Sequence, residues 1–375
     1  MTGIYIHIPF CIRKCPYCDF YSFRADETKK DSYLKAVLLC LDRWKEKIRD
    51  EIDTVYFGGG TPSVFGEKRI GEVLSFIKCN YSLTDTAEIT VECNPSSVSA
   101  EFFESLHASG VNRISMGMQS AVDKERKALG RLSDAEQVKN AVLMAKQAGI
   151  DNISLDIMLG VPCQSMKSLD ESIDFLLSLD IAHISAYMLK VEEGTPFDKM
   201  GDSLVLPDED EVAQMYLHTS RRLSLAGYSH YEISNFAKKG NESRHNTRYW
   251  KGEEYLGIGP SAHSFIHGKR FYYERDFDSF LSGSEPIFDG YGGDEEEYIM
   301  LRLRLGEGLD LREYEEKFGE KISEESENIV EFRNVSFAYE GAGDNSLENI
   351  SFTVKRGETV GVIGSTGSGK TTTLY

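Results

Sequence analysis

The stretch YIHIPFCIRKCPYCDF, residues 5–20, decides the fold. It begins inside a short β-strand pattern over Ile4–Ile8, and three cysteines follow with C-x3-C-x2-C spacing: Cys11, Cys15 and Cys18. Three thiolates on one short loop can surround a single metal centre. Because no second pair of closely spaced cysteines completes a typical four-ligand zinc site, the spacing favours a [4Fe–4S] cluster with one iron open to a small molecule. A zinc site completed by His7, or cysteines without a ligand role, are the alternatives.

Alternating strand and helix patterns continue from this loop to about residue 190. Five further strand-like runs are Thr54–Phe57, Glu88–Glu92, Arg113–Met116, Ile153–Ile157 and His183–Ala186. Amphipathic stretches separate them, and one of these begins with Ser133 to Glu136, which fits a helix capping box. Six strands alternating with helices predict an α/β fold with a parallel sheet, either doubly wound or an open barrel. Active sites in such sheets lie at the carboxyl ends of the strands.

The alternation of strand and helix patterns ends near residue 195. A helical pattern from Pro207 to about Leu225, aromatic and glycine-rich segments to Gly293 and a second helical pattern over Asp294–Leu305 predict an appended α+β region. A polar stretch near Ser323 then leads into three strand-like runs: Ile329–Phe337, Leu347–Val354 and Thr359–Ile363. We therefore divide the chain into residues 1–195, 196–322 and 328–375.

Composition excludes several classes of protein. The 375 residues carry a formal net charge of −19, with 41% hydrophobic and 27% charged residues, which is typical of a globular protein. No apolar run approaches the about 18–20 residues of a membrane span, and the first ten residues lack a signal-peptide pattern. The acidic balance disfavours nucleic acid as a partner. We therefore expect a cytoplasmic protein whose seven cysteines are ligands or buried thiols.

The cysteine spacing after a first strand resembles the radical S-adenosylmethionine (SAM) superfamily. The wider string resembles the oxygen-independent coproporphyrinogen III oxidase family, including its haem-chaperone (HemW-type) branch. The resemblance covers about residues 3–322 and recurs, in order, in FGGGTPS, VECNP, SMGMQS, SLDIMLGVP, YEISNFA, HNTRYW and YLGIGPSAHS. It implies an open (βα)6 partial TIM-type barrel with the appended α+β region and a truncated C-terminal domain. It also implies a [4Fe–4S] cluster whose open iron binds SAM and whose electron splits SAM into methionine and a 5′-deoxyadenosyl radical.

The same resemblance assigns site residues. Cys11, Cys15 and Cys18 match the cluster ligands. Tyr5 and Tyr17 match aromatic positions beside SAM, and Gly59, Gly60 and Thr61 match the strip that binds its methionine part. Four more positions match SAM contacts: Glu92, Gln119, Arg131 and Asp156. From the residues alone, the glycine-rich turn is equally a plain strand-to-helix turn, and Ser63 rules out a G-x-G-x-x-G dinucleotide fingerprint.

HNTRYW, residues 245–250, resembles a motif of the haem-chaperone branch. Histidine is a common axial haem ligand, so the resemblance implies that His245 binds haem, with Tyr249 and Trp250 packed on the macrocycle. Nearby basic residues are candidates to pair with the haem propionates: Lys238, Lys239, Arg244 and Arg248. The implied partners are haem or a porphyrinogen, haem-accepting proteins and an electron donor to the cluster.

Two features favour the chaperone branch over the oxidase. The oxidase, which decarboxylates coproporphyrinogen III with SAM, carries a further cysteine two residues after the third ligand, where this chain has Phe20. It also has a longer segment before its first strand, whereas four residues precede Tyr5 here. We therefore expect a haem-binding, cluster-containing protein that delivers haem to haemoproteins, with oxidase activity as the alternative.

The last residues carry a second motif. GSTGSGKT, residues 364–371, is a Walker A phosphate loop, in which Gly364, Gly369, Lys370 and Thr371 would contact ATP and its Mg²⁺. Residues 328–375 resemble the first strands of an ABC transporter ATPase domain, and they are too few to complete it. We therefore expect a vestigial site without hydrolysis, in a β-rich ATPase fragment joined by gene fusion or by an assembly artefact.

Overall fold

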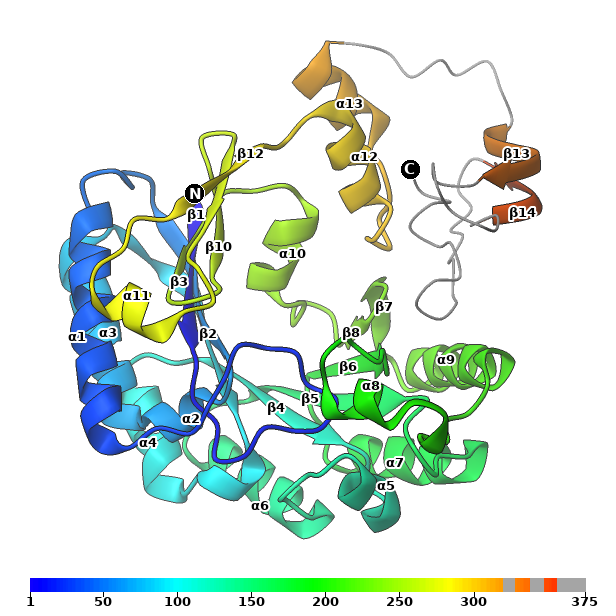
Figure 1. The fold of residues 1–375 in the computed structure, drawn as a ribbon, viewed down its shortest axis with the longest axis horizontal. Coiled ribbons are helices and arrows are strands. Elements are labelled where there is room, and N and C mark those ends of the chain that lie inside the picture. The colour runs from blue at the N-terminus through cyan, green and yellow to red at the C-terminus, as the bar shows by residue number, and fades with distance from the viewer. Residues whose placement is uncertain (320–327, 338–346, 356–375) are drawn as a thin grey trace.

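A computed structural model describes residues 1–319, 328–337 and 347–355 (Figure 1). Its main feature is a 12-stranded sheet in the order β12-β11-β10-β9-β1-β2-β3-β4-β5-β6-β8-β7. The six central strands are parallel and lie side by side in chain order: β1 (Thr2–Ile8), β2 (Ile52–Gly59), β3 (Leu83–Cys93), β4 (Arg113–Gln119), β5 (Asn152–Leu159) and β6 (His183–Met188). The six predicted strands are thus confirmed, and each is longer than expected.

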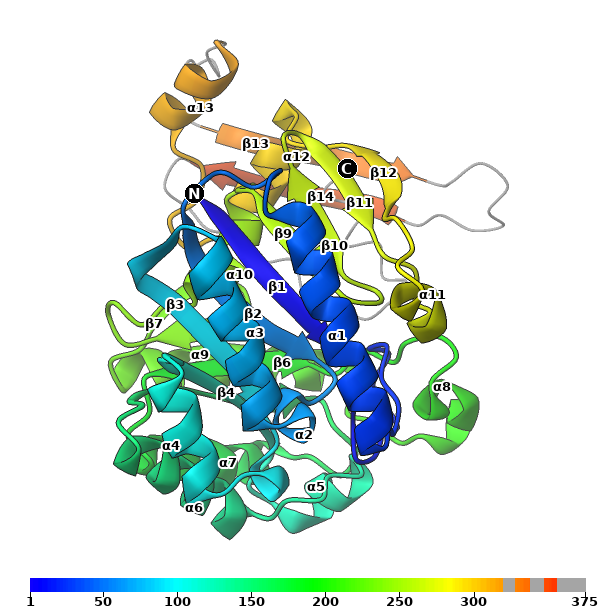
Figure 2. The ribbon, with the colours of Figure 1, turned by 90° about the vertical axis from the view of Figure 1, so that its left-hand side faces the viewer.

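Helices connect these strands and cover one face of the sheet. They are α1 (Glu27–Trp44), α2 (Pro62–Phe65), α3 (Glu67–Asn80), α4 (Ala100–Ala108), α5 (Asp123–Ala128), α6 (Ala135–Gln147) and α7 (Met166–Ser178). Figures 1 and 2 show α1, α3, α4, α6 and α7 around the outside of the curved sheet. Because β1 pairs next with β9 and β6 with β8, the six strands do not close on each other. The fold is therefore the open partial barrel rather than a doubly wound sheet.

The two faces of the central strands differ in chemistry. Ile4, Ile6 and Ile8 of β1 are fully buried against the helices, in a core that also holds Val37 and Leu41 of α1. The side chains between the isoleucines point to the opposite face, because successive residues of a strand alternate. The same alternation in the other strands places polar side chains on the inner face of the barrel, where a ligand can be bound.

The appended region extends both edges of the sheet. Beside β1 lie β9 (Tyr255–Ile258), β10 (His263–Ile266), β11 (Lys269–Tyr272) and β12 (Ile287–Tyr291), and beside β6 lie β8 (Asn235–Ala237) and β7 (Ser229–Glu232). β9 runs parallel to β1, whereas β10, β11 and β12 follow as antiparallel neighbours. Its helices are α8 (Pro196–Met200), α9 (Glu209–Leu225), α10 (Arg244–Trp250), α11 (Phe277–Leu281), α12 (Glu295–Arg302) and α13 (Leu311–Phe318).

Some predicted boundaries shift. The capping box of α6 is formed by Asp134 and Gln137 rather than by Ser133 and Glu136, because the first helical residue is Ala135 and a capping box joins the N-cap to the third helical position. α9 begins at Glu209, two residues after Pro207, with Asp208 as its N-cap. Among the described residues, no helix has the length and apolar character needed to span a membrane.

The C-terminal part contains β13 (Asn328–Phe337) and β14 (Leu347–Lys355), which pair antiparallel in a separate two-stranded sheet. Two of the three strands predicted there are therefore present. The predicted strand Thr359–Ile363 and the Walker A residues Gly364, Gly369, Lys370 and Thr371 lie outside the described residues.

Candidate functional site

The three motif cysteines lie on the loop between β1 and α1, at the carboxyl end of β1. All three are half-buried free thiols. The Cys11 N–H donates to the Phe23 carbonyl at 3.0 Å, and the Phe23 N–H donates to the Pro9 carbonyl at 2.9 Å, so the two ends of the loop are held together. On its far side, the Phe197 N–H of α8 donates to the Pro16 carbonyl at 3.1 Å. The loop is therefore held at both sides, with its three cysteines half-buried.

The glycine-rich turn after β2 lies directly beside this loop. The Gly60 N–H donates to the Ile8 carbonyl at 2.8 Å, and the Thr61 N–H donates to the Phe10 carbonyl at 2.8 Å. The Thr61 hydroxyl lies 3.3 Å from the Cys11 sulfur. A Cβ atom on Gly60 would stand 2.7–2.9 Å from backbone atoms of Ile8 and Phe10. Glycine here allows the backbone contact that brings the turn under the first cysteine.

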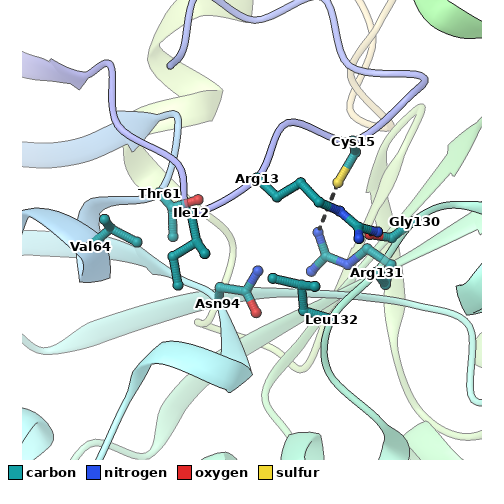
Figure 3. Close-up of a pocket in the computed structure, with 9 residues that line it drawn as sticks. All are labelled: Ile12, Arg13, Cys15, Thr61, Val64, Asn94, Gly130, Arg131 and Leu132. Atoms are coloured by element: carbon teal, nitrogen blue, oxygen red, sulfur yellow. Dashed lines mark hydrogen bonds between the residues drawn. The ribbon is translucent and has the colours of Figure 1, made fainter. Parts of the chain in front are cut away.

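Arg131 reaches the second cysteine. Its Nη1 atom lies 3.9 Å from the Cys15 sulfur, and its Nη2 atom donates to the Gly117 carbonyl at the end of β4. Figure 3 shows this contact across a hollow lined also by Thr61 and Asn94. A guanidinium beside the loop supplies positive charge to a thiolate or to a ligand carboxylate. The structure thus brings Arg131 to the cysteines, although its helix-flanking position in the sequence gave a weaker indication than the strand-end residues.

The spacing of the sulfurs bears on the nature of the metal centre. Among the described residues, the one group of three potential ligands whose ligand atoms all lie within 4.8 Å of one another is Asp50, Glu254 and His267. The three cysteine sulfurs therefore do not all lie within 4.8 Å of one another. His7 is also engaged, because its Nδ1 lies 3.2 Å from the Tyr5 hydroxyl and its Nε2 2.9 Å from the Tyr21 carbonyl. Both ring nitrogens of His7 thus have partners within the protein, and the cluster ligands stay a prediction.

Two half-buried carboxylates stand on the inner face near the strand ends. Glu92 of β3 accepts hydrogen bonds from the Tyr56 hydroxyl at 2.8 Å and from the Gly59 N–H at 3.2 Å. Burial raises the pKa of Glu92 to about 7, although these hydrogen bonds oppose the shift. Burial likewise raises the pKa of Asp156 on β5 to about 6, against the opposing effect of a hydrogen bond with Ser185. A cationic ligand would favour the charged form of both groups.

Two other predicted contacts face the same space. Gln119, the last residue of β4, has a left-handed φ of 70° at an irregularity in the β4–β5 pairing. Its buried Oε1 atom has no hydrogen-bond partner, and an unsatisfied buried acceptor marks a place for a ligand donor. Tyr17 on the cysteine loop packs against Phe197, with ring centroids 6.2 Å apart, and burial raises the pKa of its phenol.

His245 of α10 is placed differently from the expectation. It is 1% exposed, its Nδ1 lies 2.8 Å from the Thr54 hydroxyl, and its Nε2 lies 2.8 Å from the Tyr249 hydroxyl. Burial lowers the pKa of His245 to about 3. Both ring nitrogens are thus engaged inside the barrel, and neither is available to a haem iron in this conformation.

The basic residues near HNTRYW are also committed to other partners. Arg248 is 2% exposed and forms an ion pair with Asp53, and Arg244 pairs with the same carboxylate. Lys238 pairs with Asp180. These three side chains are therefore ion-paired within the protein and stabilise the packing of α10 and β8, and their expected pairing with haem propionates stays a prediction.

A second hollow lies between the edge of the sheet and α10 and α12. It is a cleft of about 400 Å³, within the range of small-molecule sites. We call it the aromatic cleft, after its ring-bearing residues Tyr5, Tyr249, Trp250, Tyr255, His263 and Phe265. Tyr5 forms one end of the cleft and also contacts His7, whose ring lies against Gly59 of the glycine-rich turn. The aromatic cleft thus adjoins the SAM-type site through one tyrosine.

Sequence reasoning missed Tyr56 and Ser185, which hydrogen-bond the two carboxylates, and it did not single out His263. The first two alternate with apolar neighbours along β2 and β6, so a comparison of the two faces of each strand would have found them. His263 lies within the quoted segment YLGIGPSAHS, but no local pattern reveals that this segment lies beside β1, because that contact depends on the pairing of β9 with β1.

Three family models match parts of the chain. The Radical SAM superfamily model matches residues 5–176, the HemN C-terminal domain model matches residues 295–334, and the ABC transporter model matches residues 347–375. The second match crosses the boundary that we predict at 323–328, so that boundary stays a prediction.

Curated relatives match over most of their length. The protein named heme chaperone HemW in Bacillus subtilis is 35% identical over 334 residues, 86% of this chain and 88% of that protein. Its namesake in Mycobacterium tuberculosis is 34% identical over 323 residues, 82% of this chain and 83% of that protein. Among solved structures, coproporphyrinogen III oxidase (HemN) from Escherichia coli superposes with a TM-score of 0.74 at 20% identity, over 85% of this chain and 79% of that one. This last similarity concerns the fold.

Proposed function

The chain belongs to the family of heme chaperone HemW proteins, and from this premise we propose that it binds haem and delivers it to haem-accepting proteins. The observation that carries the proposal is the aromatic cleft. Its walls include Tyr249 and Trp250 of the HNTRYW segment together with rings from two neighbouring strands. Flat aromatic walls suit a flat macrocycle, and a cleft that is open on one side allows the ligand to leave for an acceptor.

Radical SAM proteins use a [4Fe–4S] cluster and SAM, and the residues at the barrel mouth fit both groups. We propose that Cys11, Cys15 and Cys18 each bind one iron and leave the fourth iron to SAM. When bound, the cluster supplies one-electron chemistry. The chain itself supplies the glycine-rich turn for the methionine part of SAM and carboxylates for its cationic groups, together with the remaining predicted contacts Tyr5, Tyr17, Gln119 and Arg131.

The arrangement of charges supports this assignment. SAM carries a sulfonium and an ammonium group, and two half-buried carboxylates, Glu92 and Asp156, stand on the inner face, with Glu92 bonded to Gly59 of the glycine-rich turn. The SAM carboxylate requires a cation, which Arg131 offers beside Cys15. Gln119 adds an acceptor without a present partner. Each charged group of the ligand therefore has a complementary group at the barrel mouth.

The test is anaerobic reconstitution of the full chain with iron and sulfide, followed by titration with haem and mixing with an apo-haemoprotein. We expect stoichiometric haem binding and transfer of haem to the acceptor at a rate above that of free haem. Parallel incubation with coproporphyrinogen III, SAM and a reductant tests the oxidase alternative. Turnover of the porphyrinogen together with no haem transfer would reject the chaperone assignment.

We further propose a cytoplasmic location, an electron donor to the cluster and no nucleic-acid partner. All seven cysteines are free, and cluster ligands must remain thiols until the cluster is inserted, which a reducing compartment favours. We also propose that the chain divides at residues 195 and 322, and that the Walker A segment has no hydrolytic activity.

A further inference from the structure

The protein ligand to a haem iron is a histidine, cysteine, methionine or tyrosine whose ligating atom is unengaged beside a cavity that admits the macrocycle. The hydroxyls of the three tyrosines in the cleft already have partners, because Tyr5 contacts His7, Tyr249 contacts His245 and Tyr255 contacts Arg270. His263 is the only histidine that lines the aromatic cleft, and no cysteine or methionine lines it. Its imidazole is exposed, and among the hydrogen bonds of the described residues none involves either of its ring nitrogens. In contrast, both nitrogens of His245 are occupied by neighbouring hydroxyls.

The backbone holds His263 firmly. It is the first residue of β10 and pairs with Tyr272 of β11, and the two rings stack with centroids 5.2 Å apart and an interplanar angle of 25°. Its carbonyl oxygen packs so closely on Gly257 of β9 that a Cβ atom there would lie 2.1 Å away. The imidazole is therefore presented from a rigid sheet edge, as a ligand to a bound group should be.

The cleft also suits the rest of a haem molecule. Aromatic side chains of α10, β9 and β10 give it apolar walls, and Arg270 of β11 supplies a cation in the lining. The Arg270 guanidinium lies 4.8 Å from the centre of the Phe265 ring and pairs with Glu297 of α12. A haem propionate is a carboxylate like that of Glu297, so it is a suitable partner for the same guanidinium.

We propose that haem occupies the aromatic cleft and that His263, rather than His245, is the protein ligand to its iron. This inference rests on the proposed haem-binding function. His245 then has a structural role. The contacts of its ring with Thr54 and Tyr249 hold α10 against β2 and keep Tyr249 at the cleft. The family motif and the iron ligand are then two different parts of one site.

The experiment compares ferric haem binding to the wild-type chain and to His263→Ala, His245→Ala and His267→Ala. His267 is a matched control, since it is exposed, lies four residues from His263 and does not line the cleft. We expect His263→Ala to weaken haem binding at least about tenfold, the minimum for loss of a strong ligand, and to lose the histidine-ligated absorbance and EPR spectrum. Added imidazole should restore that spectrum, whereas His267→Ala should match the wild type.

A second arm uses iron-free protoporphyrin, followed by fluorescence. Because this ligand has no iron, the His263→Ala chain should bind it as tightly as the wild type, which separates ligation from packing of the cleft. His245→Ala should lower thermal stability but keep the histidine-ligated haem spectrum in the folded protein.

Two results would overturn the assignment while leaving haem binding intact: an unchanged spectrum in His263→Ala, or loss of the histidine ligand in folded His245→Ala. A wild-type chain that takes up no haem at all would instead overturn the proposed function, and the ligand assignment with it.

Discussion

The hydroxyl of Tyr56 donates a 2.8 Å hydrogen bond to the half-buried carboxyl group of Glu92, on the inner face of two neighbouring strands. Since burial raises the pKa of Glu92 to about 7 and this bond opposes the rise, the pair sets the charge of the site near neutral pH. A carboxylate poised in this way can change its charge when a cationic ligand binds.

The first prediction concerns SAM affinity and pH. SAM carries two positive groups, so it should bind the ionised form of Glu92, and affinity should fall as pH drops through about 7, by about tenfold from pH ~8 to ~6. Protonation of Asp156, with a pKa of about 6, should add a further decrease at the acid end. Calorimetric titration of the cluster-loaded chain across this range would measure it.

Two variants make this test specific. Glu92→Gln should bind SAM weakly at all pH values, without the step near neutral pH. Tyr56→Phe should move the step to higher pH, because the lost hydrogen bond favoured the charged carboxylate. A wild-type affinity that does not change with pH would show that Glu92 does not contact SAM.

The second prediction concerns stability without ligands. The pKa values of Glu92 and Asp156 are raised in the folded protein. Between about pH 4 and about pH 7 the folded state therefore binds more protons than the unfolded chain. The contribution of these two groups to the free energy of unfolding is lost as pH rises through that range. Glu92→Gln should therefore stabilise the apoprotein at pH ~8, by up to about 3 kcal/mol for a rise in pKa of this size. Thermal unfolding of both chains would show it.

The comparison between variants is needed because histidines act in the opposite direction. Burial lowers the pKa of His7 to about 4 and that of His245 to about 3, so their contribution to stability is lost as pH falls below about 6.5. The difference in melting temperature between Glu92→Gln and wild type should thus be larger at pH ~8 than at pH ~4. An equal difference at both values would contradict the prediction.

The third prediction separates the cysteines into two groups. Replacing Cys11, Cys15 or Cys18 singly by alanine should abolish a stable [4Fe–4S] cluster, because each sulfur holds one iron. Cys79 and Cys163 are exposed and lie outside the loop, so alanine at either should leave iron and sulfide content unchanged. Chemical iron and sulfide analysis with absorbance spectra would measure this. Full cluster content in any of the three loop variants would remove that cysteine from the ligand set.

Much of the fold could be predicted from the sequence. Each central strand shows a β-rich pattern of four or five residues between helical patterns, and that local pattern is enough to locate β1 to β6. The placement of Cys11, Glu92 and Asp156 at one edge also followed, since carboxyl ends of parallel strands share an edge. These features depend on neighbours in sequence or on a general rule of sheet topology.

Other features depended on long-range pairing that no local pattern contains. His245 has the residue type of a haem ligand, and only the packing of α10 on β2 shows that Thr54 and Tyr249 occupy its nitrogens. Arg248 has the type of an anion-binding residue, and only the fold brings Asp53 to it. The residue types indicated haem and anion binding, whereas only the tertiary contacts show which of these side chains already have partners within the protein.

The fourth prediction concerns Arg131. Its guanidinium lies beside the Cys15 sulfur, and a positive charge or hydrogen bond at a cluster sulfur stabilises the reduced cluster. Arg131→Met should therefore lower the reduction potential by some tens of millivolts, measured without SAM by spectroelectrochemistry, with full iron content. Arg13 is the control, because its guanidinium donates to the Gly130 carbonyl in the same hollow and Arg13→Met should shift the potential less. Equal shifts in the two variants would indicate a general charge effect.

The fifth prediction tests the contact between the glycine-rich turn and the cysteine loop. In Gly60→Ala, the new methyl group would stand within 2.9 Å of backbone atoms of Ile8 and Phe10, and backbone cannot move aside as a flexible side chain can. The turn and the loop must separate, which should cost about 1–3 kcal/mol, as overpacking does, and should displace Thr61 from Cys11. We expect a lower melting temperature and reduced cluster content in the same variant.

Gly71→Ala provides the comparison. Gly71 lies within α3, and its added methyl group would meet the Ser109 side chain at 3.1 Å, while alanine is the better helix former. This variant should keep its full cluster content and lose little or no stability. If Gly60→Ala were as stable and as rich in iron as Gly71→Ala, the backbone contact between the two loops would not be needed to position Cys11.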